Sequence, residues 1–320
     1  MKIAVLANSG AGGGKAADVL KKMRTAWASH VLLGVTGFGG EILGQALSPA
    51  RRASGYLPAF KQAVKLLLAE KPDLFVTVGG DGTAAYAAEE LLKAKSTVPL
   101  FGIGTGTANV GPIVSVRAED PLPDPADLKP ERLGAVEAVT LAGEHIAYGF
   151  NDLVLGNTFL GTDENGAAVT FEAEALAKDG ILKKEKPLPR ILKPEGAFRK
   201  NLAKLPDMAY PAAQLVASPI ERDSFYGRAV TGLLCWTPDS PFKAALFISP
   251  VPVVSMEECS AGFDSWLPGG QLLLEEGDLF TAENPENRVC VIADGNPYTI
   301  PDNGVGIRYV SALLSVLARR

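Results

Sequence analysis

The first 110 residues alternate short apolar runs with stretches in which apolar residues recur at steps of three and four. Short apolar runs predict buried strands, and the helical spacing between them predicts helices. Strands separated by helices of this length are typical of a parallel sheet. The predicted strands are residues 2–6, 31–35, 74–78 and 98–101, and the predicted helices are residues 15–27, 56–69 and 84–93.

The pattern changes after about residue 112. Residues 118–131 are rich in Pro and Asp and are typical of a linker, and many short β-branched runs follow, separated by Gly, Pro, Asn and Asp. This pattern predicts a mostly antiparallel β domain. The last segment, residues 306–320, returns to helical spacing. We therefore expect an α/β domain over residues 1–125, a β-rich domain over residues 126–305, and a helix over 306–320 that packs back on the first domain.

Composition narrows the classes of function. The 320 residues hold 31 Lys and Arg against 36 Asp and Glu, a formal net charge of −5. This balance argues against nucleic acid as a partner, which needs a surplus of cations, but it does not exclude small anionic nucleotides. With two His and three Cys (Cys235, Cys259 and Cys290) and no Cys-x-x-Cys spacing, zinc sites, disulfides and His-based catalysis are disfavoured. No apolar run is long enough to span a membrane, so no membrane partner and a cytoplasmic location are expected.

The most informative motif is Gly79-Gly80-Asp81-Gly82-Thr83, between a predicted buried strand and a predicted helix. Glycines let a backbone approach a phosphate chain closely, and the carboxyl end of a parallel strand is where open α/β sheets bind ligands. A carboxylate beside phosphates suits a residue that holds Mg²⁺ or accepts a proton from an attacking hydroxyl. The alternative is a tight turn in which Asp81 only caps the helix.

A second glycine cluster follows the first strand, at residues 8–14. It lacks the spacing of a Walker A loop and of the dinucleotide fingerprint. A strand, a glycine loop and a helix still form a reasonable anion site, although a turn that packs the helix close to the sheet explains the same residues.

The motif at residues 79–83 resembles the signature of the NAD kinase, diacylglycerol kinase and sphingosine kinase superfamily. Residues 101–106 (FGIGTG) are similar to the second glycine motif of NAD kinases, with Gly104 in place of an Asn, and residues 106–109 (GTAN) are similar to a lipid-kinase motif. Residues 8–10 (NSG) resemble the family's first loop without its Pro. The motifs follow the family's order along the chain.

The resemblance continues in the second half of the chain. Asn151-Asp152 is similar to the pair with which NAD kinases hold the dinucleotide, and Asp294-Gly295 is similar to an Asp-Gly near the end of the family's β domain. Residues 152–162 further resemble a branch known as ATP-NAD kinase or AcoX-like. A Thr-Gly-Ser-Thr-Ala-Tyr segment that shapes the NAD pocket of the main branch has no counterpart; the nearest region, residues 224–234, has different chemistry.

The resemblance implies a Rossmann-like α/β domain that binds ATP and a β domain that binds the acceptor. It implies a kinase that uses Mg²⁺, held by the donor phosphates and conceivably by Asp81, to phosphorylate NAD or a related small molecule and so to supply NADP. Asp81 would be catalytic, and Asn151 and Asp152 would bind the acceptor. Relatives with this β domain self-associate, so a homo-oligomer is expected. The residues expected to bind nucleotide or phosphate are Asn8, Ser9, Gly10, Gly79, Gly80, Gly82, Thr83, Gly106, Thr107 and Asn109.

Several alternatives stay open at this point. The acceptor can be a diacylglycerol or sphingoid lipid, the donor can be polyphosphate, and the protein can bind nucleotide without catalysis. Asn151-Asp152 can be an ordinary turn between strands. The basic stretch at residues 178–204 can grip donor phosphates or form a solvated loop.

Overall fold

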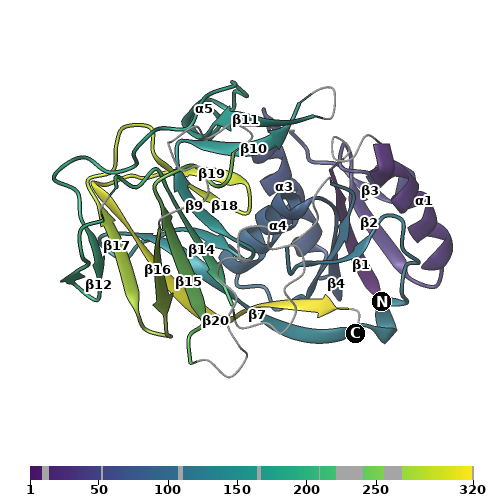
Figure 1. Cartoon of the computed structure of the whole chain (residues 1–320). Coiled ribbons are helices and arrows are strands. Elements are labelled where there is room, and N and C mark those ends of the chain that lie inside the picture. Colours follow the sequence, from purple (N-terminus) through teal and green to yellow (C-terminus); the bar gives the residue numbers. More distant parts are fainter. Residues whose placement is uncertain are drawn as a thin grey trace. The chain divides into compact units, whose positions relative to one another are not determined.

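The computed structural model describes residues 1–8, 14–51, 53–106, 111–163, 167–208, 210–220, 241–255 and 269–318. The chain forms two compact units, residues 1–133 with 312–320 and residues 134–311 (Figure 1). The first unit therefore includes the Pro- and Asp-rich segment.

The first unit is built on a parallel sheet. Its strand order is β5-β4-β1-β2-β3, and β6 pairs in parallel with β5. Figure 1 shows α1 on one face of this sheet and α3 and α4 on the other. The elements are β1 (Lys2–Ala7), α1 (Lys15–Ala26), β2 (Val31–Val35), α2 (Gly40–Leu43), β3 (Ala46–Leu47), α3 (Tyr56–Ala69), β4 (Leu74–Gly79), α4 (Asp81–Lys93), β5 (Leu100–Gly104), β6 (Val114–Arg117) and the 3-10 helix Pro125–Asp127.

Burial explains why these segments form these elements. Every residue of β4 is buried, and so is every residue of β1 except Lys2, because helices cover both faces of the sheet. The buried side chains of α1 recur at steps of three and four and face the strands. The predicted strands and helices of this half are confirmed. None of the helices in the described ranges is long and apolar enough to cross a membrane.

The second unit consists mainly of antiparallel strands. One sheet has the order β16-β15-β14-β9-β18-β19, and β10 and β11 form a separate hairpin. A further antiparallel group runs β13-β12-β17-β20, and β7 pairs with β8. The elements are β7 (Lys129–Thr140), β8 (His145–Gly149), β9 (Leu153–Gly156), β10 (Thr158–Thr162), β11 (Ala168–Glu172), α5 (Ala173–Asp179), β12 (Phe198–Lys200), β13 (Ala203–Lys204), β14 (Gln214–Pro219), β15 (Ala244–Ser249), β16 (Gly270–Leu274), β17 (Leu279–Glu283), β18 (Cys290–Ala293), β19 (Asn296–Thr299) and β20 (Gly304–Ala318). The predicted fold class, a parallel α/β domain followed by a mostly antiparallel β domain, is confirmed.

The predicted helix at residues 306–320 is wrong. Residues 304–318 form β20, whose first part pairs antiparallel with β17 from Gly304 to Arg308. Ile307 and Tyr309 are buried while Arg308 between them is exposed, which is the alternation of a strand. A short apolar segment fits the period of a helix as well as that of a strand, and pairing with neighbouring strands decides between the two.

Candidate functional site

The residues expected to bind phosphate in the first unit follow three neighbouring strands. Asn8 follows β1, Gly80 follows β4, and Gly106 lies two residues after β5. These strands are parallel and adjacent in the order β5-β4-β1, so their carboxyl ends lie at one edge of the sheet. The backbone N–H of Asn8 donates to the carbonyl of Val78 at 2.8 Å. Asn8, Gly80 and Gly106 therefore lie at one edge of the sheet.

Helix α4 begins inside the Gly-Gly-Asp-Gly-Thr motif, three residues earlier than the spacing predicts. Gly80 is extended and precedes the helix, and its carbonyl accepts the N–H groups of Thr83 and Ala84 at 3.0 and 3.2 Å. The N-cap residue is Gly80, and Asp81 is the first residue of the helix. The helix N-terminus, with its partial positive charge, lies within the motif.

Close packing explains why residue 79 is a glycine. A Cβ atom on Gly79 would lie 2.6 Å from the Oγ1 atom of Thr83, which is too close for any side chain. Thr83 is 6% exposed, and its Oγ1 accepts a hydrogen bond from the Nδ2 of Asn8 at 3.3 Å. The hydroxyl of Tyr56, at the start of α3, also bonds to Thr83. Tyr56 was missed from the sequence, where it is one more apolar position of a helix.

Asp81 joins two of the glycine motifs. Its Oδ1 atom accepts the backbone N–H of Gly111 at 3.0 Å, and its side chain is half-buried. Gly111 comes just after the segment that holds Thr107 and Asn109, which lie outside the described residues, as do Ser9 and Gly10. A fixed carboxylate at the carboxyl edge of the sheet is suited to accept a proton or to hold a cation.

Thr105 is a second residue that sequence reasoning missed. It directly follows β5, it is 1% exposed, and within the described ranges its hydroxyl has no hydrogen-bond partner. Its backbone N–H donates to the carbonyl of Gly79 at 2.8 Å. An unpaired buried hydroxyl costs about 1–3 kcal/mol, which is unusual unless a ligand or a water satisfies it.

Asn151 and Asp152 form the connection between β8 and β9 in the second unit. A carboxylate from far along the chain holds this turn, because Asp294 accepts the backbone N–H groups of Phe150, Asn151 and Asp152 at 2.9, 2.8 and 3.0 Å. The hydroxyl of Ser218 donates to the carbonyl of Asn151. The pair is therefore part of a turn, as the simpler interpretation has it, but a turn built around a buried acid.

The buried acid has an unusual environment. Asp294 is 8% exposed, and the carboxylate of Asp152 is close enough to act on its carboxyl group. Burial, and then the neighbouring carboxylate of Asp152, raise the pKa of Asp294 to about 8, against the three backbone hydrogen bonds, which lower it. Strongly shifted carboxyl groups cluster at functional sites.

In the described parts of the chain, no three His, Cys, Asp or Glu side chains lie where they could together hold a metal ion. Cys290 is a buried free thiol, and Cys235 and Cys259 lie outside those parts. The Asp81 carboxylate at the start of α4 is one described oxygen donor that could bind a cation.

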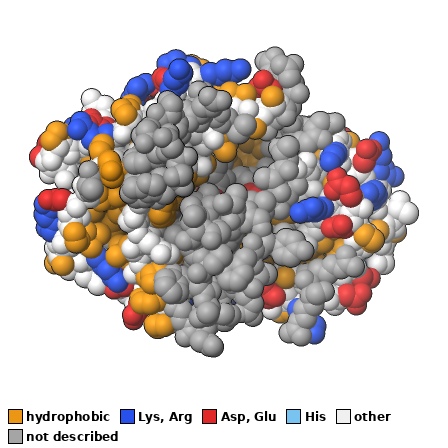
Figure 2. All heavy atoms as spheres, viewed as in Figure 1, with side chains coloured by type: hydrophobic (Ala, Val, Ile, Leu, Met, Phe, Trp, Pro, Cys, Tyr) orange, Lys and Arg blue, Asp and Glu red, His pale blue; other side chains and the backbone are white. Residues whose placement is uncertain are grey.

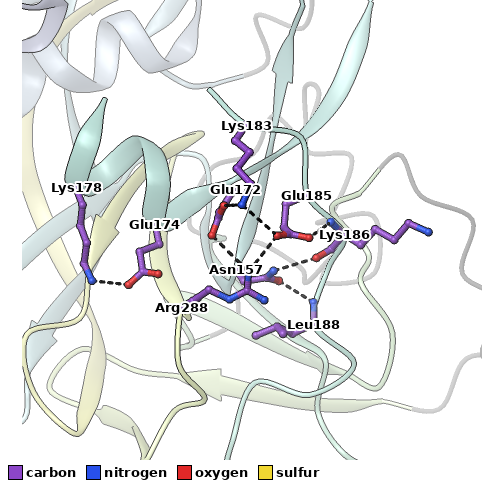
Figure 3. Close-up of polar contacts among 9 residues, drawn as sticks. All are labelled: Asn157, Glu172, Glu174, Lys178, Lys183, Glu185, Lys186, Leu188 and Arg288. Carbon is purple, nitrogen blue, oxygen red and sulfur yellow. Dashed lines mark hydrogen bonds and ion pairs between the residues drawn. The ribbon is translucent and has the colours of Figure 1, made fainter. Parts of the chain in front are cut away.

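The basic stretch at residues 178–204 is largely paired with carboxylates. Figure 2 shows Lys and Arg side chains gathered at the top of the view, above the position at which Figure 1 labels α5. In Figure 3, Lys183 lies 2.8 Å from Glu172, and Arg288 bridges Glu172 and Glu185 at 3.4 and 3.0 Å. Lys178 pairs with Glu174. These pairs satisfy the cations locally and favour a structural role over a phosphate grip.

A comparison with protein families supports the first unit's chemistry. Residues 2–115 match the family described as the diacylglycerol kinase catalytic domain. The match covers all the residues expected to bind nucleotide and ends before Asn151. It does not resolve the ATP-NAD kinase branch that the sequence resembles, and no curated protein matches the chain.

Solved structures share the fold over almost the whole chain. A yeast NADH kinase complexed with NADH is 11% identical, with a TM-score of 0.54, over 100% of this chain and 84% of that one. A putative diacylglycerol kinase from Bacillus anthracis str. Sterne is 13% identical, with a TM-score of 0.54, over 99% of this chain and 97% of that one. At such low identities the likeness establishes the fold, which both kinds of kinase share.

Proposed function

We propose that the protein is a magnesium-dependent kinase that transfers a phosphoryl group from ATP to a hydroxyl of NAD or a related small molecule. The observation that carries this proposal is the position of Asp81. It stands in a glycine-rich turn at the carboxyl edge of a parallel sheet, at the start of α4, and its carboxylate accepts the backbone N–H of Gly111. The family match over residues 2–115 supports the same class of reaction.

The donor would bind through the backbone of the first unit. Gly80 and Gly82 place no side chain in the way of a phosphate chain, and the N-terminus of α4 favours its negative charge. Mg²⁺ commonly binds to one or two carboxylates and to substrate phosphates, so the Asp81 carboxylate fits as its protein ligand. When bound, the ion would neutralise charge on the donor phosphates.

Asp81 would also receive the proton that the reaction releases. The acceptor hydroxyl gives its proton to the Asp81 carboxylate, and its oxygen bonds to the γ-phosphorus of ATP. The bond between that phosphorus and the bridging oxygen to the β-phosphate breaks, and ADP leaves. The hydrogen bond from Gly111 keeps the carboxylate in one orientation for this role.

A polar acceptor is favoured by the chemistry of residues 150–152. The Asn151 side chain is 8% exposed and the Asp152 side chain is half-buried, so both are polar groups in a largely enclosed place. Groups of this kind select ligands that carry hydroxyls, because a ligand without them leaves buried polar atoms unpaired. A ribose of NAD would meet this requirement.

A lipid acceptor is the second candidate, and the description of the matching family favours it. The match, however, ends at residue 115 and so covers the part of the chain that would bind the donor. A lipid kinase would phosphorylate diacylglycerol in mixed micelles and would be stimulated by anionic lipid.

One experiment separates these functions. Purified protein is incubated with Mg²⁺-ATP, or with polyphosphate, and with NAD, NADH, small polyols or diacylglycerol in micelles, and ADP and phosphorylated product are measured. Phosphorylated NAD supports the proposal, and phosphorylated diacylglycerol supports the second candidate. Binding of ATP without transfer to any acceptor contradicts both and indicates a nucleotide-binding protein without catalysis.

A further inference from the structure

Asp294 and the turn at residues 150–152 are joined by hydrogen bonds in both directions. The Asp294 carboxylate accepts three backbone N–H groups, and the backbone N–H of Asp294 donates to the carbonyl of Asp152 at 3.0 Å. Two segments separated by more than 140 residues are thereby held in one geometry.

The position of Asp294 is itself fixed. It is followed by Gly295, and the two residues connect β18 to β19, with φ angles of 49° and 80°. Asp-Gly with both φ angles positive is the preferred connection of a two-residue hairpin. A non-glycine residue in this region is strained, and such strain persists where the surrounding structure over-determines it.

The turn holds one polar atom that the protein leaves unpaired. The Nδ2 of Asn151 donates to the Oδ2 of Asp152 at 2.7 Å, which fixes the orientation of the amide. Its other end, the Oδ1 atom, is buried and has no hydrogen-bond partner among the residues that the structure describes. Leaving a buried acceptor unpaired costs about 1–3 kcal/mol, and an O–H or N–H of a ligand would remove that cost.

Close packing also prevents the turn from relaxing around this atom. A Cβ atom on Gly149 would lie 2.4 Å from the carbonyl oxygen of Asp152, and the buried Ser218 donates to the carbonyl of Asn151. The backbone at Asn151 is therefore fixed by close packing and by the hydrogen bond from Ser218, and its side-chain amide is fixed by the hydrogen bond to Asp152.

We propose that Asp294 is a positioning residue for the acceptor: it holds the 150–152 turn so that the Asn151 Oδ1 accepts a hydrogen bond from a hydroxyl of the phosphoryl acceptor. This inference rests on the proposed function and deepens it, because it assigns hydroxyl selection to one atom and its support to a residue far away in the sequence. On this inference, the Oδ1 atom of Asn151, which requires a hydrogen-bond donor, contributes to selection of the phosphoryl acceptor in addition to the Asp152 carboxylate.

The test is a double-mutant cycle on the full chain with the acceptor that the wild type phosphorylates. Asp294→Ala and Asn151→Ala should each raise the acceptor KM by about 10-fold or more, because a bond to a positioned polar group is lost, while the KM for ATP changes less than about twofold. The double variant should be no worse than either single variant, since Asp294 acts through Asn151. Additive losses, or an equal rise in the KM for ATP, would overturn the proposal.

Two further variants guard against a simple loss of folding. Asp294→Asn retains one acceptor oxygen and should recover part of the acceptor affinity relative to Asp294→Ala. Asp278→Ala is the matched control, because Asp278 also accepts a backbone N–H, from Glu275, and bonds Lys200 and Asn201 in another turn of the same unit. It should leave the acceptor KM unchanged; a rise like that of Asp294→Ala would show a general structural effect.

A measurement without turnover separates this inference from the proposed kinase activity. NAD, a small polyol, or diacylglycerol in micelles is added to ¹⁵N-labelled protein, and the Asn151 side-chain amide and the backbone amides of residues 150–152 are followed by NMR. A hydroxyl compound that binds should shift the Asn151 side-chain signal in the wild type but not in Asp294→Ala, even if no phosphate is transferred. No shift with any of these compounds, or the same shift in Asp294→Ala, would overturn the inference.

Discussion

The candidate sites in the two halves of the chain are built in different ways. In the first unit, residues near one another in the sequence form the turn, because Gly79, Gly80 and Asp81 come directly between a buried strand and a helix. In the second unit, Asn151 and Asp152 take their geometry from Asp294, which lies 142 residues beyond Asp152. A local motif is thus readable as a pattern, whereas a turn held by a distant carboxylate looks in the sequence like any other connection. The variants below weaken one half and leave the other intact.

The largest effect is expected on turnover, when Asp81 in the first unit is replaced. Asp81→Asn should lower turnover by about 10²–10⁴-fold, the usual contribution of a positioned proton acceptor, and leave the thermal midpoint nearly unchanged. Steady-state kinetics and thermal unfolding measure both. Asp73→Asn is the control, since Asp73 is exposed and precedes the same strand, β4, at its opposite end. Turnover that survives Asp81→Asn would remove the proposed catalytic role.

Asp294, in the second unit, should make the free energy of unfolding depend on pH. The pKa of Asp294 is raised to about 8 in the folded protein and lies near 4 when the chain is unfolded. A raised folded-state pKa contributes stability that is complete below the unfolded pKa and is lost as pH rises through the folded one. Unfolding free energy should therefore fall between roughly pH 4 and 8, by at most about 1.4 kcal/mol per pH unit for one proton.

Denaturant titrations across this range test the dependence, and Asp294→Asn should flatten it. Glu137 is the matched control in the same unit. Burial raises the pKa of Glu137, but hydrogen bonds from His145 and Arg308 outweigh it and hold the pKa below its usual value. Glu137 therefore contributes stability above about pH 4.5, and this contribution is lost as pH falls. Glu137→Gln should accordingly change the free energy of unfolding only at acidic pH. If Asp294→Asn left the slope of unfolding free energy against pH unchanged, the pH dependence would not come from Asp294.

A smaller effect is expected when the packing of the glycine motif is disturbed. Gly79→Ala should destabilise the first unit by about 1–3 kcal/mol, because its Cβ would lie 2.6 Å from the Thr83 Oγ1 and 2.8 Å from the Thr83 Cβ. Denaturant unfolding and ATP titration by calorimetry measure stability and binding. The control is Gly156→Ala in the second unit, where the nearest heavy atom would be at an ordinary 3.5 Å. Equal effects of the two substitutions would mean that the motif has no special packing.

The smallest effect is expected for the hydroxyl of Tyr56. Tyr56→Phe removes its hydrogen bond to Thr83 and keeps the ring that contacts Phe38 and Phe60. We expect a loss of about 0.5–1.5 kcal/mol in unfolding free energy and a modest rise in the KM for ATP, with the acceptor KM unchanged. A change in the acceptor KM alone would contradict the separation of the two halves.

Local pattern was enough to predict most of the first unit. The helix at residues 56–69 and the strands at 31–35 and 74–78 follow from apolar spacing that burial in a two-faced sheet requires. The error at residues 306–320 has the opposite origin. The apolar residues of β20 satisfy a helix as well as a strand, and only the pairing of Gly304–Arg308 with β17 decides the outcome.

The sequence by itself indicated the candidate phosphate-binding residues at the ends of β1, β4 and β5. Glycines and an acid between a strand and a helix have few structural uses, so the pattern points to a ligand. It also determined the fold class, through the change from helical to alternating periodicity. Only the tertiary structure decided that Asp294 holds the 150–152 turn, that Tyr56 reaches Thr83, and that the hydroxyl of Thr105 stays unpaired. Hydrogen bonds between distant segments depend on how strands are paired, and strand pairing is a property of the whole sheet and leaves no local pattern.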